Sequence, residues 1–385
     1  MELALNRASD IPLYRQVVEQ LGELIRRGVL ATGTKLPTIR ALADTTGLTR
    51  LTIQNAYLEL GALGYIESHV GRGTFVAART PPGISRDAEA QPPVSWTTQG
   101  ILADLLCEPT TGISFARAMP DPASYPVREL QMMLREATED PALLGYGSVG
   151  GDPLLREGVS RVLLERGVIA PPEAILITNG AMNAIDLTFR TLAQRGDVIF
   201  VEQPTYPGAL EAAARQGLRV VGLPLDEEGV RMADLEAHLA RYQPRFLYLV
   251  PTYQNPMGLC YSAARRVQLL ALARAHALTI IEDDIYGLLP FERAAPAALK
   301  AHDRDERIIY LSSFSKSFIP GLRLGMVTAP VAILANVART KQHSDLSSSP
   351  LLQRALALYL RRGHLGTHLA AVRALYRERC EAMQV

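Results

Sequence analysis

Lys316 stands in the run SFSKSFIPGLR, residues 313–323, directly after an apolar segment with the character of a β-strand. A lysine amine can condense with an aldehyde, and nearby hydroxyl groups and a guanidinium can hold a phosphate beside it. Ser313, Ser315 and Arg323 supply these groups close to the lysine. The run therefore predicts a covalent site for a phosphorylated aldehyde cofactor.

Lysine is scarce in this chain, because 36 of its 40 basic residues are arginine. Arginine stays protonated and does not readily form an imine, so few side chains could carry such a link. The candidates are Lys35, Lys300, Lys316 and Lys341.

The elements that must position Lys316 come from the pattern after residue 113, where short apolar segments alternate with amphipathic helical ones. This alternation indicates an α/β domain with a mostly parallel sheet that helices cover on both faces. Seven strands are predicted, near residues 174–178, 198–201, 219–223, 246–250, 278–282, 307–312 and 324–328. Ligands of such sheets bind beyond the carboxyl ends of the strands.

Polar residues follow five of these strands. A helix that starts at Gly180 and Ala181 offers free N–H groups to a phosphate, which Ser313, Ser315 and Arg323 can also bind. Asp283 can pair with a pyridine nitrogen and keep it protonated. Asn255 and Tyr286 can donate to a ring oxygen, and Tyr206 can stack on a ring. Together the groups meet the requirements of pyridoxal 5'-phosphate (PLP).

Each motif taken singly also has an ordinary explanation. Asp283 could cap a helix, Asn255 precedes a proline in common turn chemistry, and Tyr206 and Tyr286 could be core aromatics. Asp284 competes with Asp283 for the role at the ring nitrogen. The joint occurrence of five such motifs in a workable order favours the PLP site.

From about residue 113 to the end, the chain resembles the fold-type I PLP enzymes of the aspartate aminotransferase superfamily. The resemblance implies that Lys316 forms the aldimine, that Asp283 binds the ring nitrogen, and that Arg323 reaches the site because its strand runs antiparallel. It also implies that Tyr146, in the run LGYGSVGGDPLLR, crosses to the phosphate of a partner subunit in a homodimer. Aminotransferases close the site with a small C-terminal domain, which is expected here to be incomplete, since residues 332–379 are predicted to be helical.

Residues 1–77 have the pattern of three helices and a hairpin, and residues 78–112 that of a proline-rich linker to the domain at 113–385. Leucines and valines at helical spacing run from Leu13 to Gly28, Thr38 and Thr49 are plausible N-caps, and strands are predicted at residues 65–67 and 74–76. This is the arrangement of a winged helix-turn-helix.

The winged-helix pattern resembles that of the GntR family, so the whole chain resembles the MocR-type regulators. That resemblance implies contact with double-stranded DNA through seven residues: Arg40, Thr49, Arg50, Thr52, Gly71, Arg72 and Gly73. A recognition helix presents its N-terminal turn to the DNA, where arginine can bind guanine edges. Leu51 stands where a second polar residue would often be found. Residues 28–57 carry a local charge of only +2, so binding is expected to need two modules.

Composition narrows the remaining choices. A formal charge of +1 gives no global reason for a polyanionic partner, and three scattered cysteines favour neither disulfides nor zinc. His364 and His368 lie four residues apart but have no third ligand nearby, so a surface pair is expected and no metal. Without a signal peptide or a membrane span in the pattern, the protein is expected in the cytoplasm.

Three functions stay open at this point. The favoured one is a PLP-dependent transcriptional regulator that senses an amino compound or PLP itself. The alternatives are a working aminotransferase and a degenerate PLP fold that serves only dimerisation. The residues that would hold the cofactor are present, whereas no arginine after Arg339 fits the motif that binds a substrate carboxylate.

Overall fold

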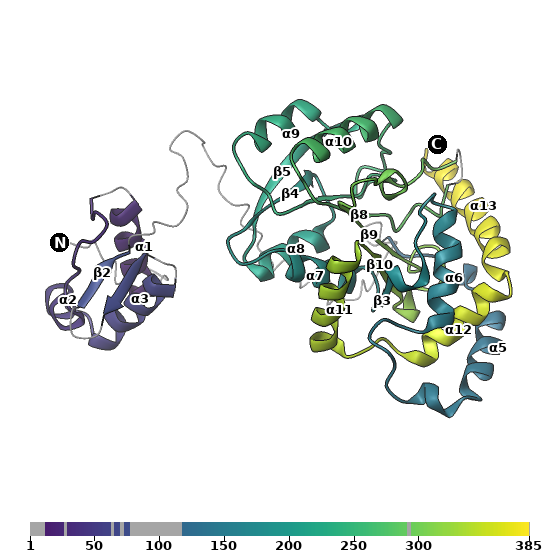
Figure 1. Ribbon diagram of the computed structural model, residues 1–385, viewed down its shortest axis with the longest axis horizontal. Coiled ribbons are helices and arrows are strands. Elements are labelled where there is room, and N and C mark those ends of the chain that lie inside the picture. Colours follow the sequence, from purple (N-terminus) through teal and green to yellow (C-terminus); the bar gives the residue numbers. More distant parts are fainter. Residues whose placement is uncertain are drawn as a thin grey trace. The chain divides into compact units, whose positions relative to one another are not determined.

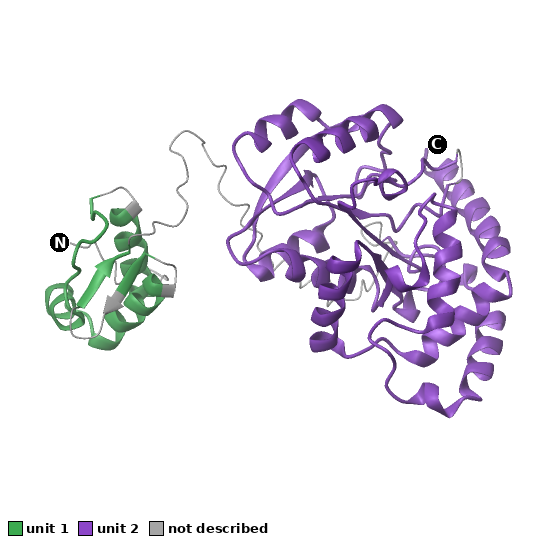
Figure 2. Cartoon of the chain, viewed as in Figure 1, with its two compact units in different colours: residues 1–94 green, residues 95–385 purple. Residues whose placement is uncertain are grey.

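The computed structural model describes residues 12–26, 29–62, 65–69, 73–77, 118–290 and 294–384. The chain divides into two compact units, residues 1–94 and 95–385, which Figure 2 shows in different colours. The predicted linker, residues 78–112, lies outside the described residues. Each unit is therefore treated by itself.

The N-terminal unit has the predicted three helices and hairpin. Its elements are α1 (Leu13–Arg26), α2 (Ile39–Thr46), α3 (Arg50–Ala62), β1 (Ile66–His69) and β2 (Gly73–Val76). Apolar residues at helical spacing form its core, among them Val17, Leu21, Leu42, Ile53, Ala56 and Leu60. The two strands pair antiparallel, with Ile66 opposite Val76. The prediction of a winged helix-turn-helix is confirmed.

Both predicted N-caps are present. The hydroxyl oxygen of Thr38 accepts a hydrogen bond from Ala41 N at 3.2 Å at the start of α2, and that of Thr49 accepts one from Thr52 N at 3.1 Å at the start of α3. Each bond satisfies a backbone N–H group that has no partner inside the helix. The turn between the helices begins at Gly47, whose φ of 64° favours glycine.

The larger unit is built on an eight-stranded sheet in the order β3-β10-β9-β8-β7-β4-β5-β6. The strands are β3 (Ile175–Thr178), β4 (Val198–Gln203), β5 (Arg219–Asp226), β6 (Gly229–Val230), β7 (Leu247–Leu249), β8 (Ile280–Asp283), β9 (Ile308–Ser313) and β10 (Gly325–Thr328). All seven predicted strands are present. The predicted number was wrong by one, because the two residues of β6 are too few to show a strand pattern.

Most neighbouring strands of this sheet are parallel, as predicted. The exceptions are β6, antiparallel to β5, and β10, antiparallel to both of its neighbours, β3 and β9. The expectation that the strand after Arg323 runs antiparallel is therefore confirmed. It follows that β3 and β9 run in the same direction and end at the same edge of the sheet.

Helices cover both faces of the sheet (Figure 1). They are α5 (Val127–Thr138), α6 (Pro153–Leu164), α7 (Ala181–Leu192), α8 (Pro207–Gln216), α9 (Met232–Leu239), α10 (Ala263–Ala275), α11 (Val331–Asp345), α12 (Pro350–Arg361) and α13 (His364–Gln384). Short 3₁₀ turns lie at Pro122–Ser124, Pro141–Leu144, Pro172–Ala174, Leu299–His302 and Pro320–Leu322. The helical prediction for residues 332–379 is confirmed, although α11, α12 and α13 divide that stretch.

The side chains of each strand alternate between the two faces. Ile199 and Val201 of β4 pack with α7, α8 and α11, whereas Phe200 between them packs with α9 and α10. The second face also holds α5, α6, α12 and α13, which cover the β3 end of the sheet. This alternation decides which side chain of each strand end meets which group of helices.

Candidate functional site

The predicted site residues gather at one edge of the sheet. The parallel strands β3, β4, β7, β8 and β9 all end there, and antiparallel β10 begins there. Asp283 is the last residue of β8, and the loops that follow the other ends carry Gly180, Tyr206, Asn255 and Lys316. The topology therefore brings together segments that are about 140 positions apart in the sequence.

Asp283 and Asp284 have separate surroundings although both are 1% exposed. Asp283 Oδ2 accepts a hydrogen bond from the Tyr248 hydroxyl at 2.7 Å, and its Oδ1 has no partner among the described residues. Asp284 is paired with Arg166 at 2.7 Å and accepts from the Tyr310 hydroxyl at 2.8 Å. Adjacent side chains of a strand point to opposite faces, so only one of the two can face the site.

The surroundings favour Asp283 for that place. Burial raises the pKa of its carboxyl group to about 7. The hydrogen bond from Tyr248 and the backbone N–H of Ile285 oppose the shift, and the charge of Asp284 adds to it. The charge of Asp283 in turn raises the pKa of Tyr206 and Tyr286, after burial as the main cause. A buried carboxylate with one free oxygen among these tyrosines can receive a charged donor from a ligand.

Among the described residues, Lys316 differs from the other lysines of the α/β unit in having no carboxylate partner. Lys300 pairs with Asp303 at 2.8 Å, and the fully buried Lys341 pairs with Asp345 at 2.5 Å. Lys316 instead donates to the carbonyl oxygen of Ala118. Burial and the positive charge of Arg323 lower its pKa, which favours the neutral, nucleophilic amine.

Gly180, Ala181 and Arg323 form a compact corner beside this lysine. Gly180 has a φ of 85°, and a Cβ atom there would lie 2.8 Å from a terminal guanidinium nitrogen of Arg323. Gly325 allows a similarly close approach, because a Cβ atom on it would lie 2.7 Å from the backbone of Gly180. Helix α7 begins at Ala181, so its N-terminal N–H groups open at this corner.

The other predicted ring and phosphate groups lie in adjoining loops. The Asn255 amide donates to the Tyr286 hydroxyl at 3.3 Å, and Tyr206 precedes the first turn of α8. Ser313 is buried at the end of β9, where its hydroxyl accepts from Ser315 N at 3.2 Å. Their roles toward a cofactor remain predictions.

Glu202 is a supporting residue that sequence reasoning missed. It lies near the end of β4 and is 1% exposed. Its carboxylate accepts hydrogen bonds from the Tyr261 hydroxyl at 2.7 Å, the Gln254 amide at 3.0 Å and Val250 N at 3.1 Å. It thereby fixes the loop that presents Asn255. A glutamate that follows the apolar run VIFV was the available signal.

A second missed support holds the loop before α7. Asp345, the partner of Lys341, accepts a hydrogen bond from the Asn179 amide at 2.7 Å. Asn179 N also donates to the Asn183 side chain at 3.0 Å. The last turn of α11 is thus tied to the residue just before Gly180. No sequence signal links these positions, which lie 166 residues apart.

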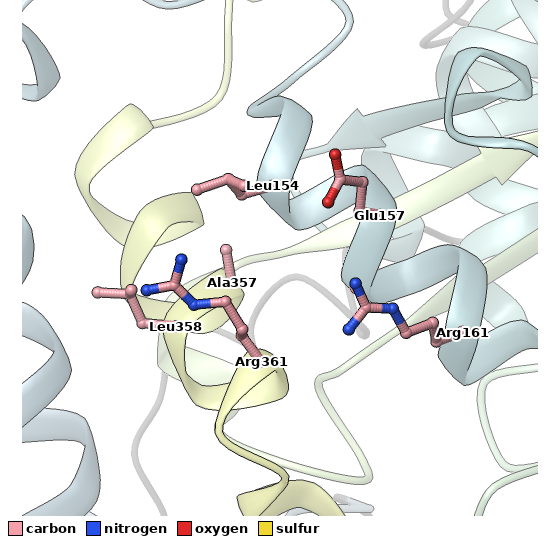
Figure 3. A pocket seen from close by; sticks show the side chains of 7 residues that line it. Leu154, Glu157, Arg161, Ala357, Leu358 and Arg361 are labelled. Carbon is pink, nitrogen blue, oxygen red and sulfur yellow. The ribbon is translucent and has the colours of Figure 1, made fainter.

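Two other features are not part of the predicted cofactor-binding set. The expected surface pair of histidines was wrong for His368, which is buried against Phe318 with ring centroids 5.5 Å apart. Within the described ranges, no three His, Cys, Asp or Glu side chains could hold a metal ion. A cavity of about 20 Å³ between α6 and α12 lies beside Arg161 and Arg361 (Figure 3), and is too small for more than a single water molecule.

The expected DNA-binding residues of the N-terminal unit lie mainly on α2 and α3. Arg40, Thr49 and Arg50 are exposed, and Thr52 is half-buried. The hydroxyl groups of Thr49 and Thr52 are hydrogen-bonded to each other at 2.8 Å. Gly73 opens β2 with a φ of 110°, a conformation that favours glycine. Gly71 and Arg72 of the predicted wing lie outside the described residues.

Comparison with known proteins identifies both units. Residues 118–383 match the family Aminotransferase class I and II, and residues 13–76 match Bacterial regulatory proteins, gntR family. The chain is 34% identical to an uncharacterized HTH-type transcriptional regulator, YisV, of Bacillus subtilis, over 98% of this chain and 80% of that one. The chain belongs to the MocR-type regulators of the GntR family.

Further relatives of this MocR-type regulator agree with that assignment. It is 32% identical to the probable rhizopine catabolism regulatory protein MocR of Rhizobium meliloti, over 98% of this chain and 77% of that one. The structure of kynurenine aminotransferase of Pyrococcus horikoshii, in complex with PMP, matches 74% of this chain and 72% of its own, with a TM-score of 0.70 and 33% identity. The resemblances to both families are confirmed. The regulator therefore joins a GntR-family unit to an aminotransferase class I and II unit.

The residues at the sheet edge fit PLP in three respects. The free Oδ1 of buried Asp283 lacks a donor, Lys316 lacks a carboxylate partner, and glycine is required at 180 for the guanidinium of Arg323 to lie close. A protonated ring nitrogen, an aldehyde and a phosphate match these three places in turn.

In the described part of the chain, no helix is long and apolar enough to cross a membrane.

Proposed function

We propose that this MocR-type regulator binds PLP covalently through Lys316 and senses an amino compound, or PLP itself, at that site. The observation that carries the proposal is the buried carboxylate of Asp283, whose Oδ1 has no partner among the described residues. An ionised group in such surroundings is unstable unless a ligand supplies a charged donor. A fold that serves only dimerisation would not need a buried carboxylate with an unpartnered oxygen at this place.

The proposed roles follow the geometry. Asp283 binds the ring nitrogen, Asn255 and Tyr286 bind the 3-oxygen, and Tyr206 lies on the ring. The phosphate is assigned to Gly180, Ala181, Ser313, Ser315 and Arg323. PLP supplies an aldehyde that bonds reversibly to primary amines. Because the pKa of Lys316 is lowered, its amine can both form the link and leave when another amine replaces it.

A regulator needs the two ligand states to differ in DNA affinity. Displacement of Lys316 frees a side chain that otherwise holds the cofactor, and an effector can shift the equilibrium only by its differential affinity for the two states. Tyr146 is 89% exposed, which supports the proposal that it reaches the phosphate site of a partner subunit. A homodimer would present two DNA-binding units to a two-fold operator.

The covalent site is tested with the purified protein. A chromophore that borohydride fixes should map to Lys316 by peptide mass spectrometry, and Lys316→Ala should take up no covalent label. Lys35→Ala is the matched control, since Lys35 lies in the other unit, and it should be labelled like the wild type. Labelling of Lys300 or Lys341 would refute the site.

Regulation is separated from catalysis by a paired assay. DNA from upstream of the protein's own gene is titrated with and without a panel of amines, and the same amines are offered with 2-oxoglutarate for turnover. We expect an amine-dependent change in DNA affinity that is lost in Lys316→Ala. Sustained turnover together with no sequence-specific DNA affinity would favour an aminotransferase instead.

A further inference from the structure

Two leucines of α3 are exposed on the outer side of the helix. An α-helix turns by about 100° per residue. The inner face of α3 is formed by buried Ile53, Ala56 and Leu60. Leu51 lies about half a turn from that face and is 66% exposed, as Leu58 is at 65%. Burial of a leucine side chain is favourable, so Leu51 would gain free energy from contact with an apolar group of a partner on this face.

The surroundings of Leu51 point to nucleic acid as that partner. Within residues 28–57, the segment that contains Leu51, exposed Lys35, Arg40 and Arg50 outnumber one acid, Asp44. An excess of positive charge attracts a polyanion, whereas an apolar protein surface would gain nothing from it. Leu51 is also in the first turn of α3, the part of a recognition helix that reaches base edges. Leu58 lies two turns farther along and is outside that reach.

The chemistry of Leu51 selects one feature of the major groove. Its polar neighbours Gln54 and Asn55 are exposed and have the amides that pair with adenine. Leu51 has no donor or acceptor, and the hydroxyls of Thr49 and Thr52 are engaged with each other. The one apolar group that the major groove displays is the C5-methyl of thymine. A leucine can therefore discriminate thymine by burying that methyl group.

Resting on the proposed DNA-binding function, we propose that Leu51 is a specificity-determining residue that reads a thymine methyl group in each operator half-site. Loss of one buried methyl group corresponds to roughly a fourfold change in an equilibrium constant. Two half-sites in one dimeric complex would then contribute roughly a sixteenfold change.

The test uses the full-length protein and synthetic DNA. Operators are selected from a random duplex library, and each thymine of a selected site is then replaced singly by uracil, which lacks only the methyl group. The wild type should lose roughly fourfold in affinity at one position of each half-site. Leu51→Ser should bind the thymine and uracil duplexes equally, and Leu51→Val should retain part of the difference.

Leu58→Ser serves as the matched control, since it removes an equally exposed leucine from the same helix, and it should keep the wild-type ratio. The inference is overturned if no uracil weakens binding, or if Leu51→Ser keeps the same ratio of affinities. Selection of no DNA sequence at all would instead overturn the proposed function itself, so the two failures are distinguishable.

Discussion

The two units of this regulator expose their functional side chains in opposite ways. In the described part of the N-terminal unit, Gln16 is the single buried polar residue, and the side chains expected to meet DNA are exposed or half-buried, mainly on α2 and α3. In the α/β unit, Glu202, Glu282, Asp283 and Asp284 are all 1% exposed or less. The DNA-binding surface can therefore change with little effect on stability, whereas the cofactor site is part of the buried structure.

The contrast between the two units predicts the largest loss of stability when the buried ion pair between Arg166 and Asp284 is broken. Arg166→Met should destabilise the α/β unit by about 3–5 kcal/mol, because Asp284 would be left buried without its ion-pair partner. Denaturation followed by tyrosine circular dichroism measures this change. Arg190→Met removes an exposed partner of Asp186 and should cost less than about 1 kcal/mol. Equal effects of the two variants would contradict the contrast.

Asp283→Asn tests the cost of the buried site group in the cofactor-free protein. Folded Asp283 keeps its proton to about pH 7, whereas an unfolded aspartate loses it near pH 4. The folded state binds more protons in that window, so this group makes stability fall as pH rises through it. The variant should be the more stable one at pH 8, by at most about 4 kcal/mol, with the difference vanishing near pH 4.

Glu202 and Glu282 titrate in the same window, with pKa values that burial raises to about 7. Both remain in Asp283→Asn, so the comparison of wild type and variant reports Asp283 together with its contribution to the raised pKa of Glu202. Denaturant titrations from pH 4 to pH 8 give the two curves. With PLP bound the order should reverse, since the variant cannot offer a carboxylate to the ring nitrogen. If the free energies of unfolding of wild type and variant change with pH in parallel without cofactor, the raised pKa of Asp283 is contradicted.

Gly325→Ala should displace the corner formed by Gly180, Ala181 and Arg323, because the new Cβ atom would clash with backbone atoms there. A Cβ atom at this position would meet backbone atoms of Gly180 at 2.7 Å, so one of the two segments must shift. We expect a loss of about 1–3 kcal/mol and weaker PLP binding, measured by titration of the chromophore. Gly321→Ala is the control, because nothing lies within 4 Å of a Cβ atom there. An unchanged PLP affinity in Gly325→Ala would separate that corner from the cofactor.

The smallest effect belongs to the N-terminal unit. Thr49→Ala removes the N-cap bond to Thr52 N and should destabilise α3 by about 1 kcal/mol. Faster hydrogen exchange of the α3 amides, with unchanged exchange in the α/β unit, would show this. Leu58→Ala, on the exposed side of the same helix, should leave that exchange nearly unchanged. A change that spreads to the α/β unit would contradict the independence of the two folds.

Much of this arrangement could be predicted from local sequence. The apolar spacing gave α1 and α3, and the polar residues after apolar runs gave the five loops at the sheet edge. The sequence alone did not decide whether Asp283 or Asp284 faces the site. Adjacent side chains of a strand point to opposite faces, and which of them faces a given side depends on where the strand begins. Glu202 and the Asn179–Asp345 bond escaped prediction because their partners lie far apart in sequence.

The reversed direction of β10 has one further consequence. This strand separates β3, which leads into the corner formed by Gly180, Ala181 and Arg323, from β9, which leads to Lys316. Adjacent strands are about 4.8 Å apart, so these two loops stand roughly 10 Å from each other across β10. A small molecule bound by both loops would therefore link β3, β10 and β9 and stabilise their pairing. Cofactor binding would then affect local opening of the sheet as well as the chemistry at its edge.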